Sequence, residues 1–135
     1  MNEAVANRSG RAHSREKVIF VVDDEALLLE LVSVILEPCG YHIKTFHDPE
    51  SALRAYASAQ PEPALIITDY AMHTMNGLEL LAACRRIQPR QKALLVSGTV
   101  GPEVLDHAPC QPDRFLSKPY QAKQLIVAVK SLLAD

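Results

Sequence analysis

The stretch ALIITD, residues 64–69, decides the fold, because an uninterrupted apolar run ends directly in a carboxylate. A short, continuous apolar run is typical of a strand that is buried on both faces of a sheet. The stretch VIFVVDD, residues 18–24, has the same form and ends in two aspartates. If the two runs are neighbouring parallel strands, Asp23, Asp24 and Asp69 meet at one edge of the sheet.

Three carboxylates at one edge indicate a site for a divalent cation. Like charges that lie close together raise one another's pKa unless a cation is placed among them. Oxygen ligands around an open position suit a hard ion such as Mg2+, and a metal ion beside a carboxylate is typical of sites that handle phosphate. The alternative is that each aspartate caps a helix or forms a turn after its strand, which explains one aspartate more easily than three.

The composition is that of an ordinary single domain, with 135 residues of which 48% are apolar and 22% charged. The net charge of -2 gives no general attraction to nucleic acid or to an anionic membrane. No apolar run reaches membrane-spanning length and no signal peptide is visible, so we expect a cytoplasmic protein with no membrane or direct nucleic-acid partner. The three cysteines are widely spaced, which favours reduced thiols, and the five histidines show no metal-ligand spacing.

Apolar patterns predict five strands that alternate with five helices. The strands are expected at 17–22, 41–46, 64–68, 93–96 and 114–117. The helices are expected at 25–37, 48–58, 77–87, from 101 for about two turns, and at 121–133. The alternation predicts a parallel sheet with helices on both faces. Residues 1–16 are polar and aperiodic, which predicts a disordered arm before a domain that covers 17–135.

The expected helix 25–37 carries more apolar residues than one face can hold. The residues at helical spacing, which we expect to face the core, are Leu28, Leu31, Val32, Ile35 and Leu36. Three further apolar residues lie off that stripe: Leu27, Leu29 and Val34. We expect these three to extend the core rather than to form a surface for a partner.

Together these features resemble the receiver domain of two-component response regulators, over about residues 17–135. The motifs are VVDDE at 21–25, Asp69 with Met72, MNGLEL at 75–80, Ser97-Gly98, and FLSKPY at 115–120. The resemblance implies a flavodoxin-like α/β fold, in which a doubly wound five-stranded parallel sheet has the order 2-1-3-4-5. The alternating pattern of 41–46, which is typical of an edge strand, agrees with that order.

The resemblance also implies roles for the acidic residues. Asp69 would be the phospho-acceptor, attacking a phosphohistidine of a histidine kinase or phosphotransfer protein. Mg2+ would bind to Asp24, Asp69 and the backbone carbonyl of Ala71, with Asp23 acting mostly through water. The protein would then be a signalling domain rather than an enzyme, with only self-directed phosphotransfer and autodephosphorylation.

The remaining motif residues would respond to the phosphoryl group. Lys118 would bring a point charge to its oxygens, and the bond from Lys118 to Pro119 is the candidate for the cis peptide of the family. Ser97 would donate a hydroxyl, and the competing interpretation is a turn serine before Gly98. Phe115 occupies the position of the family's switch aromatic, although it could also be a plain core residue.

The sequence departs from the family pattern in the loop after the acceptor. Ala71 offers no polar side chain at a position that influences hydrolysis of the phosphoryl group, so the lifetime of that group stays open. His73 stands where a proline is common, and Ser97 replaces a frequent threonine. The fourth helix looks short, and in the family it belongs to the output surface.

The leading hypothesis is a response regulator that changes its affinity for an unidentified protein when Asp69 is phosphorylated. The alternatives are a receiver-shaped interaction module without phosphorylation, and the receiver piece of a larger hybrid kinase or regulator. A flavodoxin-like cofactor binder is disfavoured because the acidic stretch 23–25 would repel a phosphate. A serine hydrolase is disfavoured because Leu95 stands where its GxSxG motif needs glycine.

Overall fold

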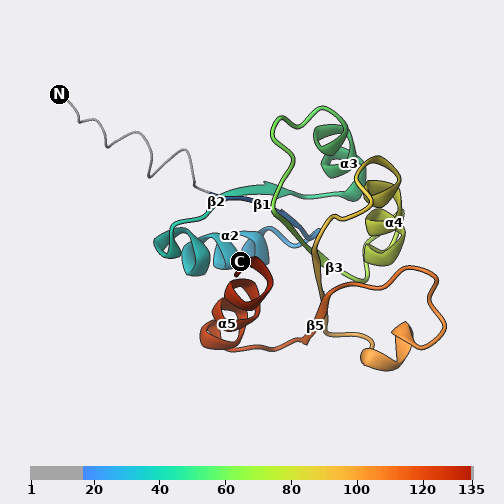
Figure 1. Cartoon of the computed structure of the whole chain (residues 1–135). Helices are drawn as coiled ribbons and strands as arrows, with labels where there is room; N and C mark the ends of the chain where they lie inside the picture. The colour runs from blue at the N-terminus through green and yellow to red at the C-terminus, as the bar shows by residue number, and fades with distance from the viewer. Residues whose placement is uncertain (1–16, 135) are drawn as a thin grey trace.

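The computed structural model describes residues 17–134 and contains one five-stranded parallel sheet between two layers of helices (Figure 1). The strands are β1 (Val18–Val22), β2 (His42–Phe46), β3 (Leu65–Asp69), β4 (Ala93–Ser97) and β5 (Arg114–Ser117). The helices are α2 (Ala26–Leu36), α3 (Pro49–Ala57), α4 (Gly77–Ile87) and α5 (Ala122–Leu133). The strand order β2-β1-β3-β4-β5 confirms the predicted doubly wound sheet. The predicted N-terminal arm, 1–16, lies outside the described residues.

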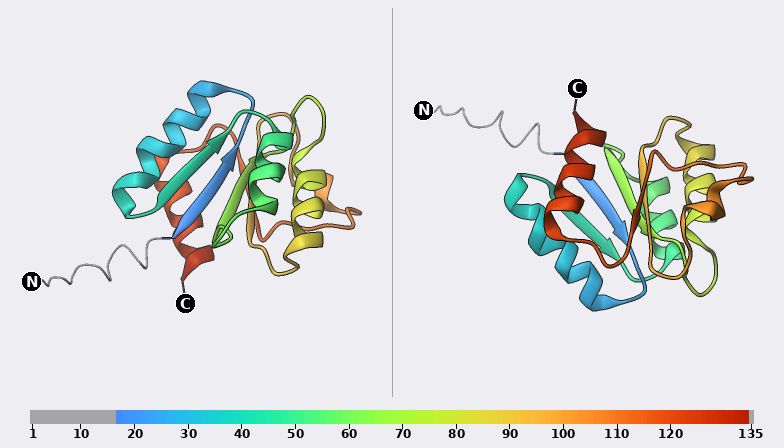
Figure 2. Two further views of the ribbon diagram at one scale, coloured as in Figure 1. Left: turned by 90° about the horizontal axis from the view of Figure 1, so that it is seen from above. Right: turned by 90° about the horizontal axis from the view of Figure 1, so that it is seen from below.

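Each face of the sheet is covered by its own pair of helices (Figure 2). In β1, Ile19 and Val21 pack in the cluster with α2 and α5, whereas Phe20 and Val22 pack in the cluster with α3 and α4. Successive side chains of a strand point to opposite faces, so a strand in the middle of the sheet must be apolar throughout. The continuous runs of β1, β3 and β4 therefore fill the centre, and the alternating β2 lies at an edge.

The orientation of α2 differs from the prediction. Leu29 lies off the stripe that was expected to face inward, and it is buried, as the expectation that it extends the core requires. Leu31 is 46% exposed and the side chains of Leu27 and Val34 are 79% and 63% exposed, so none of these three belongs to the core. Only one side of α2 is covered by the sheet and α5, so a helix with this many apolar residues leaves some of them in solvent. Within residues 17–134, no helix is both long and apolar enough to cross a lipid bilayer.

The connection from β4 to β5 also differs from the prediction. In place of a two-turn helix it contains one 3-10 turn, Pro102–Leu105, so the described chain has four α-helices rather than five. The amide Nε2 of Gln111 donates to the carbonyls of Leu105 and Ala108, at 2.7 and 3.0 Å, and so satisfies backbone groups that a longer helix would have paired. The other elements begin and end within one residue of their predicted bounds.

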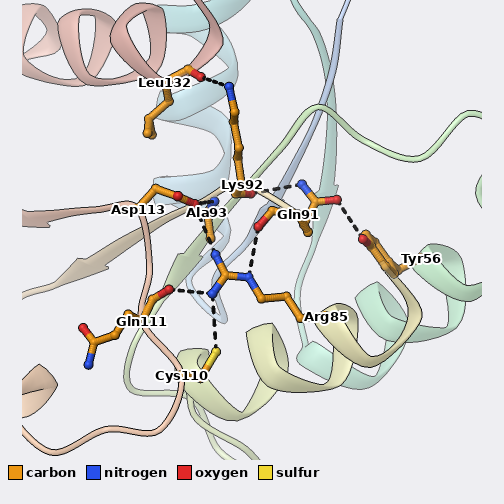
Figure 3. A network of polar contacts seen from close by, with 9 residues as sticks. All are labelled: Tyr56, Arg85, Gln91, Lys92, Ala93, Cys110, Gln111, Asp113 and Leu132. Atoms are coloured by element: carbon orange, nitrogen blue, oxygen red, sulfur yellow. Dashed lines mark hydrogen bonds and ion pairs between the residues drawn. The ribbon is translucent and has the colours of Figure 1, made fainter. Parts of the chain in front are cut away.

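The guanidinium of Arg85 holds this connection against the rest of the molecule (Figure 3). From the last turn of α4, it donates to the carbonyl of Gln111 at 2.6 Å and to Asp113 Oδ2 at 3.2 Å. Its Nε donates to the carbonyl of Gln91 at 3.0 Å, and Asp113 Oδ2 also accepts from the backbone N–H of Ala93 at 2.8 Å. One side chain thereby joins α4, the start of β4 and the segment before β5.

Candidate functional site

The site lies where β1 and β3 end. Asp69 is the last residue of β3, and Asp23 and Asp24 directly follow β1. The two strands are parallel neighbours in a register that pairs Val22 with Thr68. Their carboxyl ends therefore meet, and one carboxylate oxygen from each of the three aspartates lies within 4.8 Å of the others. The structure thus brings together the three residues that the sequence placed at one edge.

Lys118 reaches this acidic group from the end of β5. Its Nζ lies 3.1 Å from Asp23 Oδ2 and 3.2 Å from Asp69 Oδ1. The backbone N–H of Lys118 donates to the carbonyl of Ser97 at 2.8 Å, which fixes the start of the loop beside β4. The peptide bond from Lys118 to Pro119 is cis.

Burial and the neighbouring opposite charge shift the pKa values of Asp69 and Lys118 in opposite directions. Burial raises the pKa of the Asp69 carboxyl above its ordinary value; the Lys118 ammonium opposes this shift, and the carboxylates of Asp23 and Asp24 add to it. Burial alone would lower the pKa of Lys118, but the carboxylates of Asp23 and Asp69 outweigh burial and raise it. The ammonium therefore stays charged, and one cation among three carboxylates leaves an excess of negative charge that suits a further cation.

An open cleft gives access to the three carboxylates. Its lining residues are Asp24, Glu25, Asp69, Ala71, His73, Gly98, Thr99 and Lys118. Asp23 is buried, and its Oδ1 accepts from the backbone N–H of Glu25 at 2.9 Å. Carboxylate oxygens that lie together beside an open space are the donor set that Mg2+ prefers, so the residues present fit this ion.

Gly77 allows the acceptor strand and α4 to meet. A Cβ at this position would clash with the backbone oxygen of Asp69 and would lie 2.7 Å from Leu95 Cδ1. The N–H of Gly77 donates to the carbonyl of Tyr70 at 2.8 Å, which closes the loop after β3. Asn76 then caps α4, because its side chain accepts from the N–H of Glu79 while the Glu79 side chain accepts from the N–H of Asn76.

The hydroxyl of Ser97 is used within its own turn. Its Oγ accepts from the backbone N–H groups of Thr99 at 3.2 Å and Val100 at 3.1 Å, and the residue is 1% exposed. Thr99, rather than Ser97, lines the cleft. Phe115 lies on β5 opposite Leu95 and is half-buried. In this structure Ser97 has the geometry of a turn serine, and Phe115 is neither fully exposed nor part of the deep core.

Sequence reasoning missed three residues that line the cleft: Glu25, His73 and Thr99. His73 Nδ1 lies 3.6 Å from Asp24 Oδ2. The histidine was assigned no chemistry because it has no partner at metal-ligand spacing in the sequence. Its place in the short loop after β3, close to the acceptor position, was the available signal.

A family model for the response regulator receiver domain matches residues 19–130. The chain belongs to this family. Phosphorylation on an aspartate is the general function of receiver domains, which are signalling domains rather than enzymes in the usual sense. Such domains bind Mg2+ at an acidic cluster, and the group of three aspartates is compatible with that ion.

Individual relatives agree with this assignment. The chain is 29% identical to "Response regulator receiver protein CpdR" of Brucella abortus over 120 residues, which cover 87% of this chain and 97% of that protein. It is 28% identical over 124 residues to "Probable transcriptional regulatory protein TcrX" of Mycobacterium tuberculosis, covering 91% of this chain and 52% of that protein. The chain therefore spans about half the length of TcrX.

A solved structure has the same fold. The crystal structure of a CheY-like response regulator receiver domain protein from Methanospirillum hungatei JF-1 superposes with a TM-score of 0.76 and 25% sequence identity. The superposition covers 86% of this chain and 92% of that chain. The fold of this chain is therefore shared with a solved receiver domain.

Proposed function

We propose that Asp69 is the phospho-acceptor of this receiver domain. The observation that carries the proposal is the position of its carboxylate, which lies within 4.8 Å of the carboxylates of Asp23 and Asp24 and 3.2 Å from the Lys118 ammonium. Asp69 also borders the open cleft, so a donor can reach it, whereas Asp23 is buried and bonded to both Lys118 and the backbone of Glu25.

The reaction exchanges one phosphorus bond for another. A carboxylate oxygen of Asp69 attacks the phosphorus of a phosphohistidine, a P–O bond forms, and the P–N bond breaks. The leaving imidazole nitrogen takes up a proton, which leaves neutral histidine on the donor. This transfer depends on alignment and charge neutralisation more than on covalent chemistry by the protein. Lys118 Nζ already lies beside the acceptor oxygen, so it can pair with the negatively charged oxygens of the phosphoryl group once that group is transferred.

The divalent ion would be held by the side chains of Asp24 and Asp69 and by the backbone carbonyl of Ala71. Asp23 would act through water or through Lys118, because its oxygens already accept hydrogen bonds. When bound, Mg2+ supplies positive charge to the phosphoryl oxygens and holds them in place. Ala71 has no polar side chain that could orient water toward the phosphoryl group.

Phosphorylation would act through Ser97 and Phe115. Ser97 Oγ accepts from the N–H groups of Thr99 and Val100, so rotation of its side chain toward the phosphoryl group would exchange these two bonds, each worth about 1 kcal/mol, for one donated by its hydroxyl. A charged acceptor gives a stronger hydrogen bond than a backbone contact, so the exchange becomes favourable only after phosphorylation. The Phe115 ring would then move into the space that Ser97 leaves, which is a population shift between two states.

The phosphoryl donor would be a histidine kinase or a histidine phosphotransfer protein, met in the cytoplasm, and the phosphorylated form would bind a protein target. If the receiver is a piece of a larger hybrid kinase or regulator, one of these partners is a domain of the same chain. Phosphotransfer profiling against the purified kinases of the source organism would identify the donor.

The proposal is tested by incubating the protein with acetyl phosphate and Mg2+ and measuring intact mass. We expect one phosphoryl group on the wild type, none on Asp69→Asn, and normal addition to Asp106→Asn, an exposed residue of the β4–β5 connection. Equal addition to wild type and Asp69→Asn would reject Asp69 as the acceptor. Failure of the wild type to bind Mg2+ or to be labelled would favour an unphosphorylated interaction module.

A further inference from the structure

His73 stands at the rim of the acidic cleft with an imidazole that is free to move. Its side chain is 90% exposed, and it lines the same cleft as Asp24, Asp69 and Ala71. Rotation of an exposed side chain costs little, so its position can adjust to whatever occupies the cleft. The residue comes two positions after Ala71, in the short loop that joins β3 to α4.

The distance between His73 and Asp24 suits two ligands of one ion better than a hydrogen bond. Nδ1 of His73 lies 3.6 Å from Oδ2 of Asp24, which exceeds the range of an N–H···O bond. Ligand atoms about 2.1 Å from a common ion are separated by about 3.0 Å at a right angle and about 4.2 Å on opposite sides. The observed separation falls between these limits, so one ion can contact both atoms. His73 lies outside the group of three aspartates whose oxygens are within 4.8 Å of one another, so its exposed imidazole must rotate toward Asp69 to share their ion.

We infer that His73 is an additional ligand of the divalent-cation site and makes that site favour transition-metal ions. The inference rests on the proposed function, because it uses the same ion that Asp24 and Asp69 would hold. A site of oxygens alone suits Mg2+, whereas an imidazole nitrogen adds affinity for ions such as Mn2+, Co2+ and Zn2+. The chain therefore offers a mixed oxygen and nitrogen donor set, which prefers these ions more strongly than carboxylates alone would.

The alternative is an exposed ion pair between His73 and Asp24. A pair in which one side chain is 90% exposed contributes little to stability and does not distinguish one divalent ion from another. If His73 only pairs with Asp24, its removal would free a carboxylate and affect Mg2+ and Co2+ alike. The two interpretations therefore predict different selectivities.

Isothermal titration of the full chain with Co2+ and, separately, with Mg2+ tests the inference. We expect His73→Ala to weaken Co2+ binding by at least about tenfold, with little change for Mg2+. The matched control is His42→Ala, an exposed histidine at the first residue of β2, at the opposite end of the parallel sheet, which should leave both affinities unchanged. Mg2+ should displace Co2+ competitively, and the visible spectrum of bound Co2+ should change in His73→Ala.

Three outcomes would overturn the inference: unchanged Co2+ affinity in His73→Ala, equal changes for Co2+ and Mg2+, or Co2+ that Mg2+ cannot displace. Labelling by acetyl phosphate with Mg2+ separates this failure from failure of the proposed function. If His73→Ala is labelled normally but Co2+ binding does not depend on His73, the acceptor role stands and the inference falls. If the wild type neither binds Mg2+ nor is labelled, both fall.

Discussion

At the residue scale, Lys118 balances the acidic group in the absence of metal. Its ammonium lies within 3.2 Å of both Asp23 and Asp69. Because burial disfavours an unpaired charge, the folded protein would lose stability if either the ammonium or the carboxylates were removed alone. The ammonium and a divalent ion would therefore both neutralise the carboxylate of Asp69. The two cations are not interchangeable, because the lysine is tied to β5 while the ion would lie at the cleft.

We expect Lys118→Met to lower the free energy of unfolding of the metal-free protein by about 1–3 kcal/mol, because Asp23 is left buried without this cation. Mg2+ should then raise the melting temperature of the variant more than that of the wild type, since it replaces missing positive charge. Circular dichroism melts with and without Mg2+ measure both effects. Lys123→Met, at an exposed position of α5, is the control. Equal Mg2+ shifts in wild type and Lys118→Met would contradict the account.

Some site residues could be predicted and others could not. Asp23, Asp24 and Asp69 were predictable because strand ends and parallel pairing fix where they meet. His73 was not, because the path of a loop decides what its side chains approach. The current hydrogen bonds of Ser97 were also beyond the sequence, since a serine at a strand end can face either the cleft or its own turn.

At the scale of elements, the start of α4 is fixed by the space available at Gly77. We expect Gly77→Ala to destabilise the fold by about 1–3 kcal/mol, because the new Cβ must push against backbone at Asp69 and against Leu95. It should also weaken Mg2+ binding, since it displaces the strand end that carries the acceptor. Urea denaturation and Mg2+ titration measure the two effects.

Gly101→Ala is the matched control for this substitution. A Cβ at Gly101 would meet the carboxylate end of the flexible Glu103 side chain, which can move aside. We expect this variant to have nearly wild-type stability and Mg2+ affinity. If both alanine variants behaved alike, close packing of Gly77 against β3 would not be what positions Asp69.

The two errors at this scale have one kind of cause. The apolar stripe of α2 was misplaced because several of its faces are apolar, and only packing against the sheet and α5 decides which one is buried. The fourth helix was over-extended because local propensity does not register a side-chain clamp such as Arg85 or the bonds of Gln111. Elements with an unambiguous apolar pattern, such as the continuous runs of β1 and β3, were predicted within one residue.

At the scale of the whole molecule, Arg85 links elements far apart in the chain (Figure 3). We expect Arg85→Met to speed amide hydrogen exchange in residues 105–113, because the carbonyl of Gln111 and the carboxylate of Asp113 lose their shared donor. Arg86→Met, the exposed neighbour on α4, should exchange like the wild type. Equal protection in Arg85→Met and wild type would show that the connection holds its shape without the clamp.

The arrangement of the molecule gathers the acceptor and the residues expected to respond to it at one edge of the sheet. The carboxyl ends of β1, β3, β4 and β5 bring the acidic residues, Ser97 and Lys118 to one rim, as the parallel order requires. The resemblance to receiver domains implied this order, and the sequence pattern agreed with it, because the alternating strand belongs at an edge. We propose that, at this rim, a carboxylate oxygen of Asp69 accepts the phosphoryl group.

Chemical trapping at Asp69 tests that claim most directly. After incubation with acetyl phosphate and Mg2+, borohydride reduces an aspartyl phosphate to homoserine, and peptide mass spectrometry locates the changed residue. We predict homoserine at position 69 in the wild type, and none when Mg2+ is removed by chelation. Homoserine at another aspartate, or a phosphorylated protein whose Asp69 stays unmodified, would contradict the account.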